Sequence, residues 1–268
     1  MNTKTTSSGI LNILNGAKER LPENLNHVLH KRDKALGWVL LDIANLHKAA
    51  GIHAFFDCNE ENDLKQNFYV VSKLILEAIG EKGGPEFEVG NEIFYALLSD
   101  SPEVINEMAR VETPALLNDR QNPLMSRFKV HMWQLAILGD YDALRLKVEK
   151  LAKNGRKEDR ELASTGQDFF TLLMRSDKQG LEELIQKHAL IRSADPLTEG
   201  FLSFLGTLEA KLCWLKGIPV QIDSPMVPMV LMPVSPLSHY DDVYEFLQTG
   251  WVPPPQGMVG KISRWIHR

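Results

Sequence analysis

Apolar residues recur at helical spacing in the first part of the chain, from about residue 25 to residue 50. Side chains three or four residues apart share one face of a helix, so this spacing predicts an amphipathic α-helix. Gly51 follows the pattern directly and is expected to end the helix. The predicted core face consists of Leu36, Leu40, Ile43 and His47, widened by Val39, Leu41 and Leu46.

The same periodicity predicts helices over residues 63–79 and 198–216. A run of glycine and proline at residues 80–85 breaks the first helix, and Gly217 ends the second, because both residue types oppose continuation of a helix. The core faces are formed by Phe68, Val71, Leu74, Ile75 and Ala78 in the first helix and by Leu202, Leu205, Leu208, Leu212 and Leu215 in the second.

Three segments share one pattern, an apolar helix that ends in a small residue followed by aspartate. They cover residues 93–100, 133–140 and 170–177, so the aspartates are 40 and 37 residues apart. Apolar residues stand four and eight positions after each aspartate, which places them on one face of a second helix. Such helix–turn–helix units favour a stacked αα array. The apolar residues are Val104 and Met108, Leu144 and Val148, and Leu181 and Ile185.

The aspartates of these units, Asp100, Asp140 and Asp177, are interpreted as helix caps. An aspartate side chain accepts hydrogen bonds from the exposed amides of the following helix, and its charge suits the positive end of that helix. Asp100 and Glu103 also have a spacing like that of a capping box. The alternative is a functional cluster of three carboxylates, but capping explains both the residue type and its place.

Composition changes after residue 217. Residues 218–236 contain five prolines around an apolar run, which excludes a helix or a central strand and predicts an extended strap over the helices. A short helix is expected over residues 240–247. Residues 251–257 are again rich in proline, and a packed tail anchored by Trp251 and Trp265 is favoured over a polyproline ligand.

These patterns predict an all-α fold, an array of antiparallel helix pairs that resembles a solenoid. Residues 1–24 are expected to be flexible or to form a short helix, and residues 25–217 to form the helical-repeat domain. Residues 218–268 would supply the strap, the short helix and the tail, packed on the same domain.

The chain has 268 residues and a formal net charge of −5, with two cysteines. The acidic balance argues against nucleic acid or an anionic membrane as the main partner. Cys58 and Cys213 are too few for a disulfide framework, which suits a reducing compartment. The sequence has neither a signal-peptide pattern nor an apolar run of membrane-spanning length, so the cytoplasm is expected.

Motifs for catalysis and for cofactor binding are absent from the sequence. It contains no phosphate-binding glycine loop, no G-x-S-x-G and no H-E-x-x-H. His27 and His30 are three residues apart, and His47 and His53 straddle an expected helix end, but neither pair has the further ligands that a zinc site needs. His131 is interpreted as a packed or surface histidine. Neither a cofactor nor a metal ion is therefore expected, and the protein is not expected to be an enzyme.

Clustered carboxylates are the remaining candidates for a functional surface. Most such clusters are a solvated face or a bias at the start of a helix. An acidic docking surface for a basic partner is the functional alternative, since such groups steer association. The candidate partner-binding residues are Asp57, Glu60, Glu61, Asp63, Asp241 and Asp242; Glu182 and Glu183 form a further acidic pair.

Several stretches together resemble the immunity 49 family of bacterial polymorphic-toxin immunity proteins. They are the early helix at residues 34–44, the repeated unit ending at Asp100, Asp140 and Asp177, and the late helix at residues 208–217 with the strap after it. The resemblance covers roughly residues 34–247.

The resemblance implies an antitoxin in the cytoplasm that binds a cognate toxin domain and neutralises it stoichiometrically by occluding or distorting its active site. The toxin would be delivered by contact-dependent or type VI secretion, and a nuclease is one candidate. A basic phosphate-binding site would suit an acidic inhibitor. A homodimer is a further possibility. The alternatives are an αα-repeat scaffold that binds a peptide in a groove and an enzyme with an unrecognised helical site.

Overall fold

Helices account for most of the chain in a computed structural model that describes residues 3–31, 35–191 and 197–253. No β-strand occurs in these ranges, which confirms the all-α prediction for this part of the chain. The α-helices are α1 (Thr3–Asn26), α2 (Leu36–Cys58), α3 (Glu61–Glu77), α4 (Asn91–Ser99), α5 (Pro102–Met108), α6 (Pro114–Asp119), α7 (Ser126–Leu138), α8 (Tyr141–Asn154), α9 (Lys157–Thr165), α10 (Phe169–Arg175), α11 (Lys178–His188) and α12 (Phe204–Leu215).

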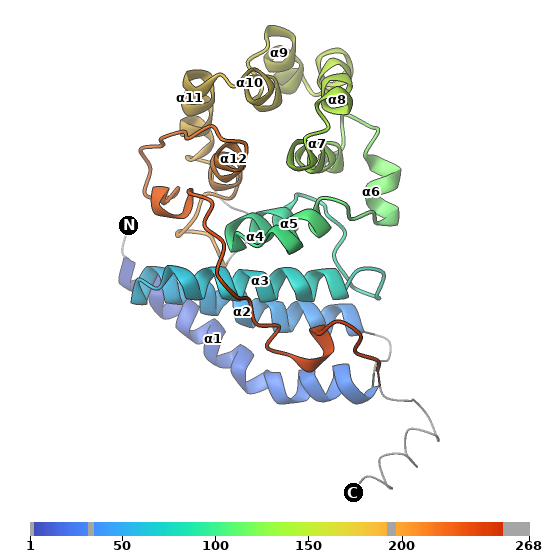
Figure 1. Ribbon diagram of the computed structural model, residues 1–268, viewed down its shortest axis with the longest axis vertical. Coiled ribbons are helices and arrows are strands. Elements are labelled where there is room, and N and C mark those ends of the chain that lie inside the picture. The colour runs from blue at the N-terminus through green and yellow to red at the C-terminus, as the bar shows by residue number, and fades with distance from the viewer. Residues whose placement is uncertain (1–2, 32–34, 192–196, 254–268) are drawn as a thin grey trace, which may run out of the picture.

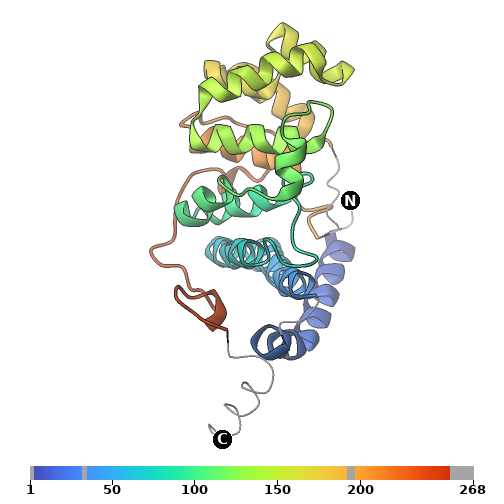
Figure 2. The same ribbon diagram turned by 90° about the vertical axis from the view of Figure 1, so that its right-hand side faces the viewer.

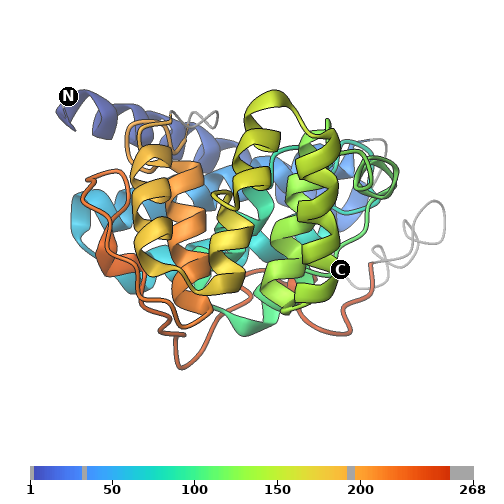
Figure 3. The same ribbon diagram turned by 90° about the horizontal axis from the view of Figure 1, so that it is seen from above.

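The helices form layers that follow the order of the chain. The three long helices α1–α3 lie at one end, α4 and α5 cover them, and α7–α12 follow an arc at the other end, seen nearly end-on (Figure 1). A view from the side shows the same layers (Figure 2), and a view from above shows the helices of the arc running side by side (Figure 3). The contacts α2·α3, α7·α8 and α10·α11 join helices that are neighbours in sequence. A regular antiparallel repeat remains a prediction.

Helix α2 corrects the prediction that Gly51 ends a helix. The helix begins at Leu36 and continues through Gly51 to Cys58, where Asn59 takes a left-handed conformation. A Cβ atom on Gly51 would lie 3.1 Å from Cε1 of Phe68 on α3. The glycine is therefore a point of close helix packing and not a stop signal. The preceding segment is also more helical than expected, because α1 begins at Thr3 and spans 24 residues.

The capping prediction is confirmed for two of the three aspartates. Asp140 accepts a hydrogen bond from the amide of Ala143, and Asp177 accepts one from the amide of Gly180. The prediction is wrong for Asp100, and so is the capping box with Glu103. Asp100 has a left-handed backbone (φ 58°) at the end of α4, and Ser101 is the residue that precedes α5.

The Asp100 carboxylate instead forms a buried ion cluster with two lysines. Its Oδ1 atom lies 2.5 Å from Nζ of Lys211 on α12, and its Oδ2 atom lies 3.1 Å from Nζ of Lys65 on α3. All three residues are at most 2% exposed. Burial lowers the pKa of Lys211, and the charge of Asp100 opposes that effect. A buried charge is tolerated when it is paired and hydrogen-bonded, which this arrangement provides.

The lysines of the cluster also hold the proline-rich strap. Lys211 donates to the main-chain oxygens of Leu231 (2.7 Å) and Pro233 (3.1 Å), and Lys65 donates to that of Ser235 (3.0 Å). The strap is largely extended, with a turn at residues 225–227 and a 3₁₀ turn, η2 (Met229–Leu231), and it crosses α12, α4 and α3. The strap prediction is therefore correct in conformation, and its main-chain carbonyls are part of the ion cluster.

The helix predicted over residues 240–247 is wrong, because side chains of α3 hold the first part of this segment in a non-helical conformation. Gln66 donates to the main-chain oxygen of Asp241 (2.7 Å) and accepts from its amide (3.0 Å), while the Tyr69 hydroxyl donates to Asp242 (2.8 Å). Helical structure is limited to η3 (Glu245–Leu247), a 3₁₀ turn. Trp251 packs edge-on against Phe246, as expected for an anchor, whereas Trp265 lies outside the described residues.

The helix predicted from residue 198 starts later than expected. Residues 198–201 form turns, and α12 begins at Phe204 because Ser203 caps it by accepting from the amide of Gly206. The predicted stop is correct, since Gly217 adopts φ +76° just after the helix. No helix in the described part of the chain combines the length and the apolar character needed to cross a membrane.

The three aspartates offer a direct test of the ion cluster. Replacing Asp100 by alanine leaves the buried ammonium group of Lys211 without its counter-ion and removes one of the two carboxylates paired with Lys65, which is expected to cost about 3–5 kcal/mol of unfolding free energy. Asp140→Ala and Asp177→Ala remove an exposed cap and should each cost about 1 kcal/mol. Urea denaturation of the three variants measures the difference. Equal losses at all three positions would show that Asp100 is no more than a cap.

Candidate partner-binding site

Four of the candidate acidic residues lie where α2 passes into α3. Asp57 accepts from His53 one turn earlier (2.6 Å), and Glu61 pairs with Lys65 (2.7 Å). Glu60 is exposed, and the neighbouring Asp63, which accepts a hydrogen bond from the protonated Glu60 carboxyl and carries a negative charge, raises the pKa of Glu60. Two carboxylates held close together repel each other, so a cationic group of a partner would be attracted to this end of α3.

The other two candidates, Asp241 and Asp242, are brought to the same helix by their contacts with Gln66 and Tyr69. The six residues therefore lie along the end of α2, the N-terminal half of α3 and the segment that packs on it. We call them the α3 acidic surface. Asp242 is partly buried and fixed by Tyr69, whereas Asp241 is exposed.

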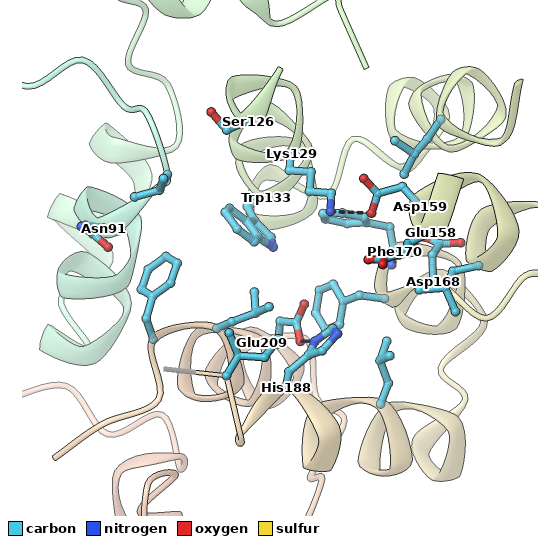
Figure 4. Close-up of a pocket in the computed structure, with 18 residues that line it drawn as sticks. Asn91, Ser126, Lys129, Trp133, Glu158, Asp159, Asp168, Phe170, His188 and Glu209 are labelled. Carbon is cyan, nitrogen blue, oxygen red and sulfur yellow. Dashed lines mark hydrogen bonds and ion pairs between the residues drawn. The ribbon is translucent and has the colours of Figure 1, made fainter. Parts of the chain in front are cut away.

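A cavity lies within the arc of helices, at a distance in sequence from these acidic residues. It has a volume of about 460 Å³, within the range of ligand sites, and its lining is mostly apolar. Side chains from α7, α9, α10, α11 and α12 converge on it (Figure 4). The apolar lining residues are Val89, Trp133, Leu151, Leu162, Phe169, Phe170, Leu184, Ile191, Phe204 and Leu205; the polar ones are Asn91, Ser126, Lys129, Glu158, Asp159, Asp168, His188 and Glu209.

The indole N–H of Trp133 is an unmatched donor in this cavity. Trp133 is 6% exposed, and no acceptor among the described residues reaches its Nε1 atom. The nitrogen points toward the centre of the cavity (Figure 4). A buried donor without an acceptor is uncommon in proteins, and it marks a position where a partner atom would be favourable. Sequence reasoning placed Trp133 in a repeated core pattern and contained no signal for this role.

Two ion pairs line the same cavity. Lys129 lies 2.6 Å from Asp159, and His188 Nδ1 lies 2.6 Å from Oε2 of Glu209. Burial lowers the pKa of His188, but the hydrogen bond and charge of Glu209 outweigh it, so the pKa is raised above its ordinary value of 6.5. Asp168 is not available to a ligand in the same way, because it caps α10 through the amides of Phe170 and Thr171.

The histidines considered as metal ligands have other surroundings. His47 lies between Asn67 and the Tyr244 hydroxyl, each at 2.8 Å, and burial lowers the pKa of its ring. In the part of the chain that the structure describes, no three His, Cys, Asp or Glu residues are grouped so that they could hold a metal ion. Cys58 is exposed at the end of α2, whereas Cys213 is buried in α12, where burial raises the pKa of the thiol.

The described part of the chain is helical and contains a buried ion cluster and a mostly apolar cavity. The family model "Immunity protein 49" matches residues 34–231. The chain therefore belongs to the immunity protein 49 family, which implies a role as an immunity protein in a toxin system. No curated protein and no solved structure matches the chain.

The His188–Glu209 pair makes a pH-dependent prediction. Since the pKa of His188 is raised in the folded state, the pair stabilises the fold while the ring is protonated. This stabilisation is present below the unfolded pKa and is lost as the pH rises through the folded one. The advantage in unfolding free energy of the native protein over Glu209→Gln should therefore shrink as the pH rises from 6.5, the ordinary pKa of histidine, through the raised pKa of His188. NMR titration of His188 should show a lower pKa in the variant, and an identical titration in both proteins would contradict the assignment.

Proposed function

We propose that this protein binds the catalytic domain of one cognate toxin in a stoichiometric complex and neutralises it by occluding the active site. It acts by binding and not by catalysis. The observation that carries the proposal is the family match over residues 34–231, because that range includes every helix from α2 to α12. The cytoplasm is the compartment in which such a complex would protect the cell.

The charge of the molecule supports a nuclease as the toxin. A nuclease that binds phosphate groups has a basic active site, and the chain combines a net charge of −5 with the α3 acidic surface. The Glu60–Asp63 pair is the part of that surface where like charges are held together, so a lysine or arginine of the toxin would relieve repulsion there. In this proposal the acidic residues bind the basic site of the nuclease that would otherwise bind the phosphate backbone of a nucleic acid.

The cavity favours a toxin inhibitor over a scaffold that captures peptides. A peptide-binding groove of a helical repeat is expected to be lined by asparagine, lysine and arginine. The cavity lining instead has one asparagine and one lysine among mostly aliphatic and aromatic side chains. This composition suits the desolvated centre of a protein–protein interface.

The primary test is rescue. If a toxin domain is encoded beside this gene, co-expression with it should restore growth of cells that the toxin alone kills, and the purified pair should elute as one complex. Continued lethality with soluble, folded immunity protein present would refute the proposed function.

A charge-reversal pair tests the α3 acidic surface. Glu60 and Asp241 are suitable because they are exposed, whereas Glu61 and Asp242 also support the fold through Lys65 and Tyr69. Glu60→Lys with Asp241→Lys should slow toxin association about 10- to 100-fold at low salt. The control is Asp142→Lys with Glu183→Lys, which makes the same charge change on exposed positions of α8 and α11. Stopped-flow fluorescence or surface plasmon resonance measures the association rates. Equal rates for the two double variants would exclude a specific role for this surface.

A further inference from the structure

The cavity inside the arc of helices has an exposed apolar rim. Val89, Leu162 and Ile191 line it and are 41%, 38% and 52% exposed. Large apolar side chains that surround a concave site and remain in contact with water mark an interaction surface. Beneath this rim the walls are formed by buried aromatic residues, so an inserted group would leave water almost completely.

The unmatched donor at the base of the cavity is held in place before anything binds. Gly90 permits this, because a Cβ atom at that position would lie 3.0 Å from Cζ3 of Trp133. Phe204 packs edge-on against the indole, with ring centroids 6.3 Å apart. The indole can donate one hydrogen bond and accepts none, so its partner must carry an acceptor oxygen or nitrogen.

The charges around the cavity restrict the occupant further. Lys129 and His188 are already paired with Asp159 and Glu209, so a negative charge on the occupant would have no free cation to pair with. Of the other two carboxylates in the lining, Asp168 caps α10 and Glu158 is exposed to water, so a positive charge buried in the cavity would gain little from them. The lining therefore fits an uncharged group, apolar over most of its surface, that carries one hydrogen-bond acceptor. A tyrosine or another large side chain beside a main-chain carbonyl has this chemistry.

The rim indicates that the group belongs to a protein. A small molecule inside the cavity would leave the rim side chains exposed, whereas a protein loop that inserts one side chain would cover them as well. A central pocket that receives one large side chain, surrounded by apolar contacts that exclude water, is the usual arrangement of an energetic centre in an interface.

We propose that the cavity bounded by Trp133, Leu162, Phe170, His188, Phe204 and Glu209 receives a large uncharged side chain from a loop of the toxin domain, and that Trp133 Nε1 donates a hydrogen bond to an oxygen of that loop. This inference rests on the proposed function, since it names the point at which the toxin is anchored. It assigns the anchor to α7–α12 and not to the α3 acidic surface, which leaves the acidic surface to steer association.

Two variants and one matched control test the anchor by calorimetry with the toxin domain identified by the rescue experiment. Trp133→Phe keeps the apolar ring and removes the donor, so the dissociation constant should rise about tenfold. Leu162→Lys places a charge on the rim and should weaken binding on the order of 30-fold. Leu146→Lys is the control, since Leu146 on α8 is 66% exposed and does not line the cavity. It should bind as the native protein does.

Folding is checked separately from binding. Each variant should retain its helical circular dichroism and unfold within about 5 °C of the native protein, because Leu162 is at the surface and phenylalanine preserves the ring contact with Phe204. A photo-crosslinking amino acid at position 162 should capture the toxin and identify the inserted loop by mass spectrometry.

The outcomes separate this inference from the proposed function. Native affinity in both cavity variants, or an equal loss in Leu146→Lys, would overturn the anchor while leaving toxin neutralisation intact. A small molecule that co-purifies with the native protein and is lost from Trp133→Phe, as seen by native mass spectrometry, would also overturn it. Absence of rescue and of binding by the native protein would refute the proposed function, and the anchor with it.

Discussion

One carboxylate and two ammonium groups, all removed from water, determine how the distant parts of this chain meet. Asp100 comes from the end of α4, Lys65 from α3 and Lys211 from α12, and the spare hydrogens of the lysines are taken up by strap carbonyls. Any shift of one segment would leave a buried charge without its partner, so the four segments are fixed together. The position of the segment that carries Asp241 and Asp242 follows from this constraint, because it continues directly from the strap.

The sequence predicts those features that depend on interactions between residues close together in the chain. Asp140 and Asp177 cap the helices that follow them, because a capping bond reaches only three residues along the chain. Asp100 has the same local sequence, but Lys65 and Lys211 compete for its carboxylate, and neither is near it in the chain. The prediction that Gly51 ends a helix fails for a related reason, since the need for a small residue arises from Phe68 on the neighbouring helix. Periodicity therefore predicts most of the helices and proline density predicts the strap, while the exceptions depend on contacts across the fold.

The candidate partner-binding site shows the same difference between what local sequence predicts and what long-range contacts decide. Clustered charge pointed to the six acidic residues, but their assembly along α3 depends on Gln66 and Tyr69, whose side chains replace the expected helix at residues 240–247 with an extended segment. The cavity could not be predicted from the sequence. The aromatic and aliphatic residues that line it follow the same pattern as those of a fully packed core. Trp133 differs from a core residue because its indole N–H has no acceptor among the described residues. This difference depends on the three-dimensional surroundings of the side chain and cannot be read from the sequence.

The two cysteines have opposite chemical surroundings, with a practical consequence for spectroscopy. Burial in α12 keeps Cys213 out of solvent and raises the pKa of its thiol, whereas Cys58 is exposed next to Asp57. Thiolates are the reactive form, so a maleimide fluorophore would attach to Cys58 and leave Cys213 unmodified in the folded protein. The unaltered chain thus accepts a dye at the junction of α2 and α3, where its emission would report whatever approaches that end of the molecule.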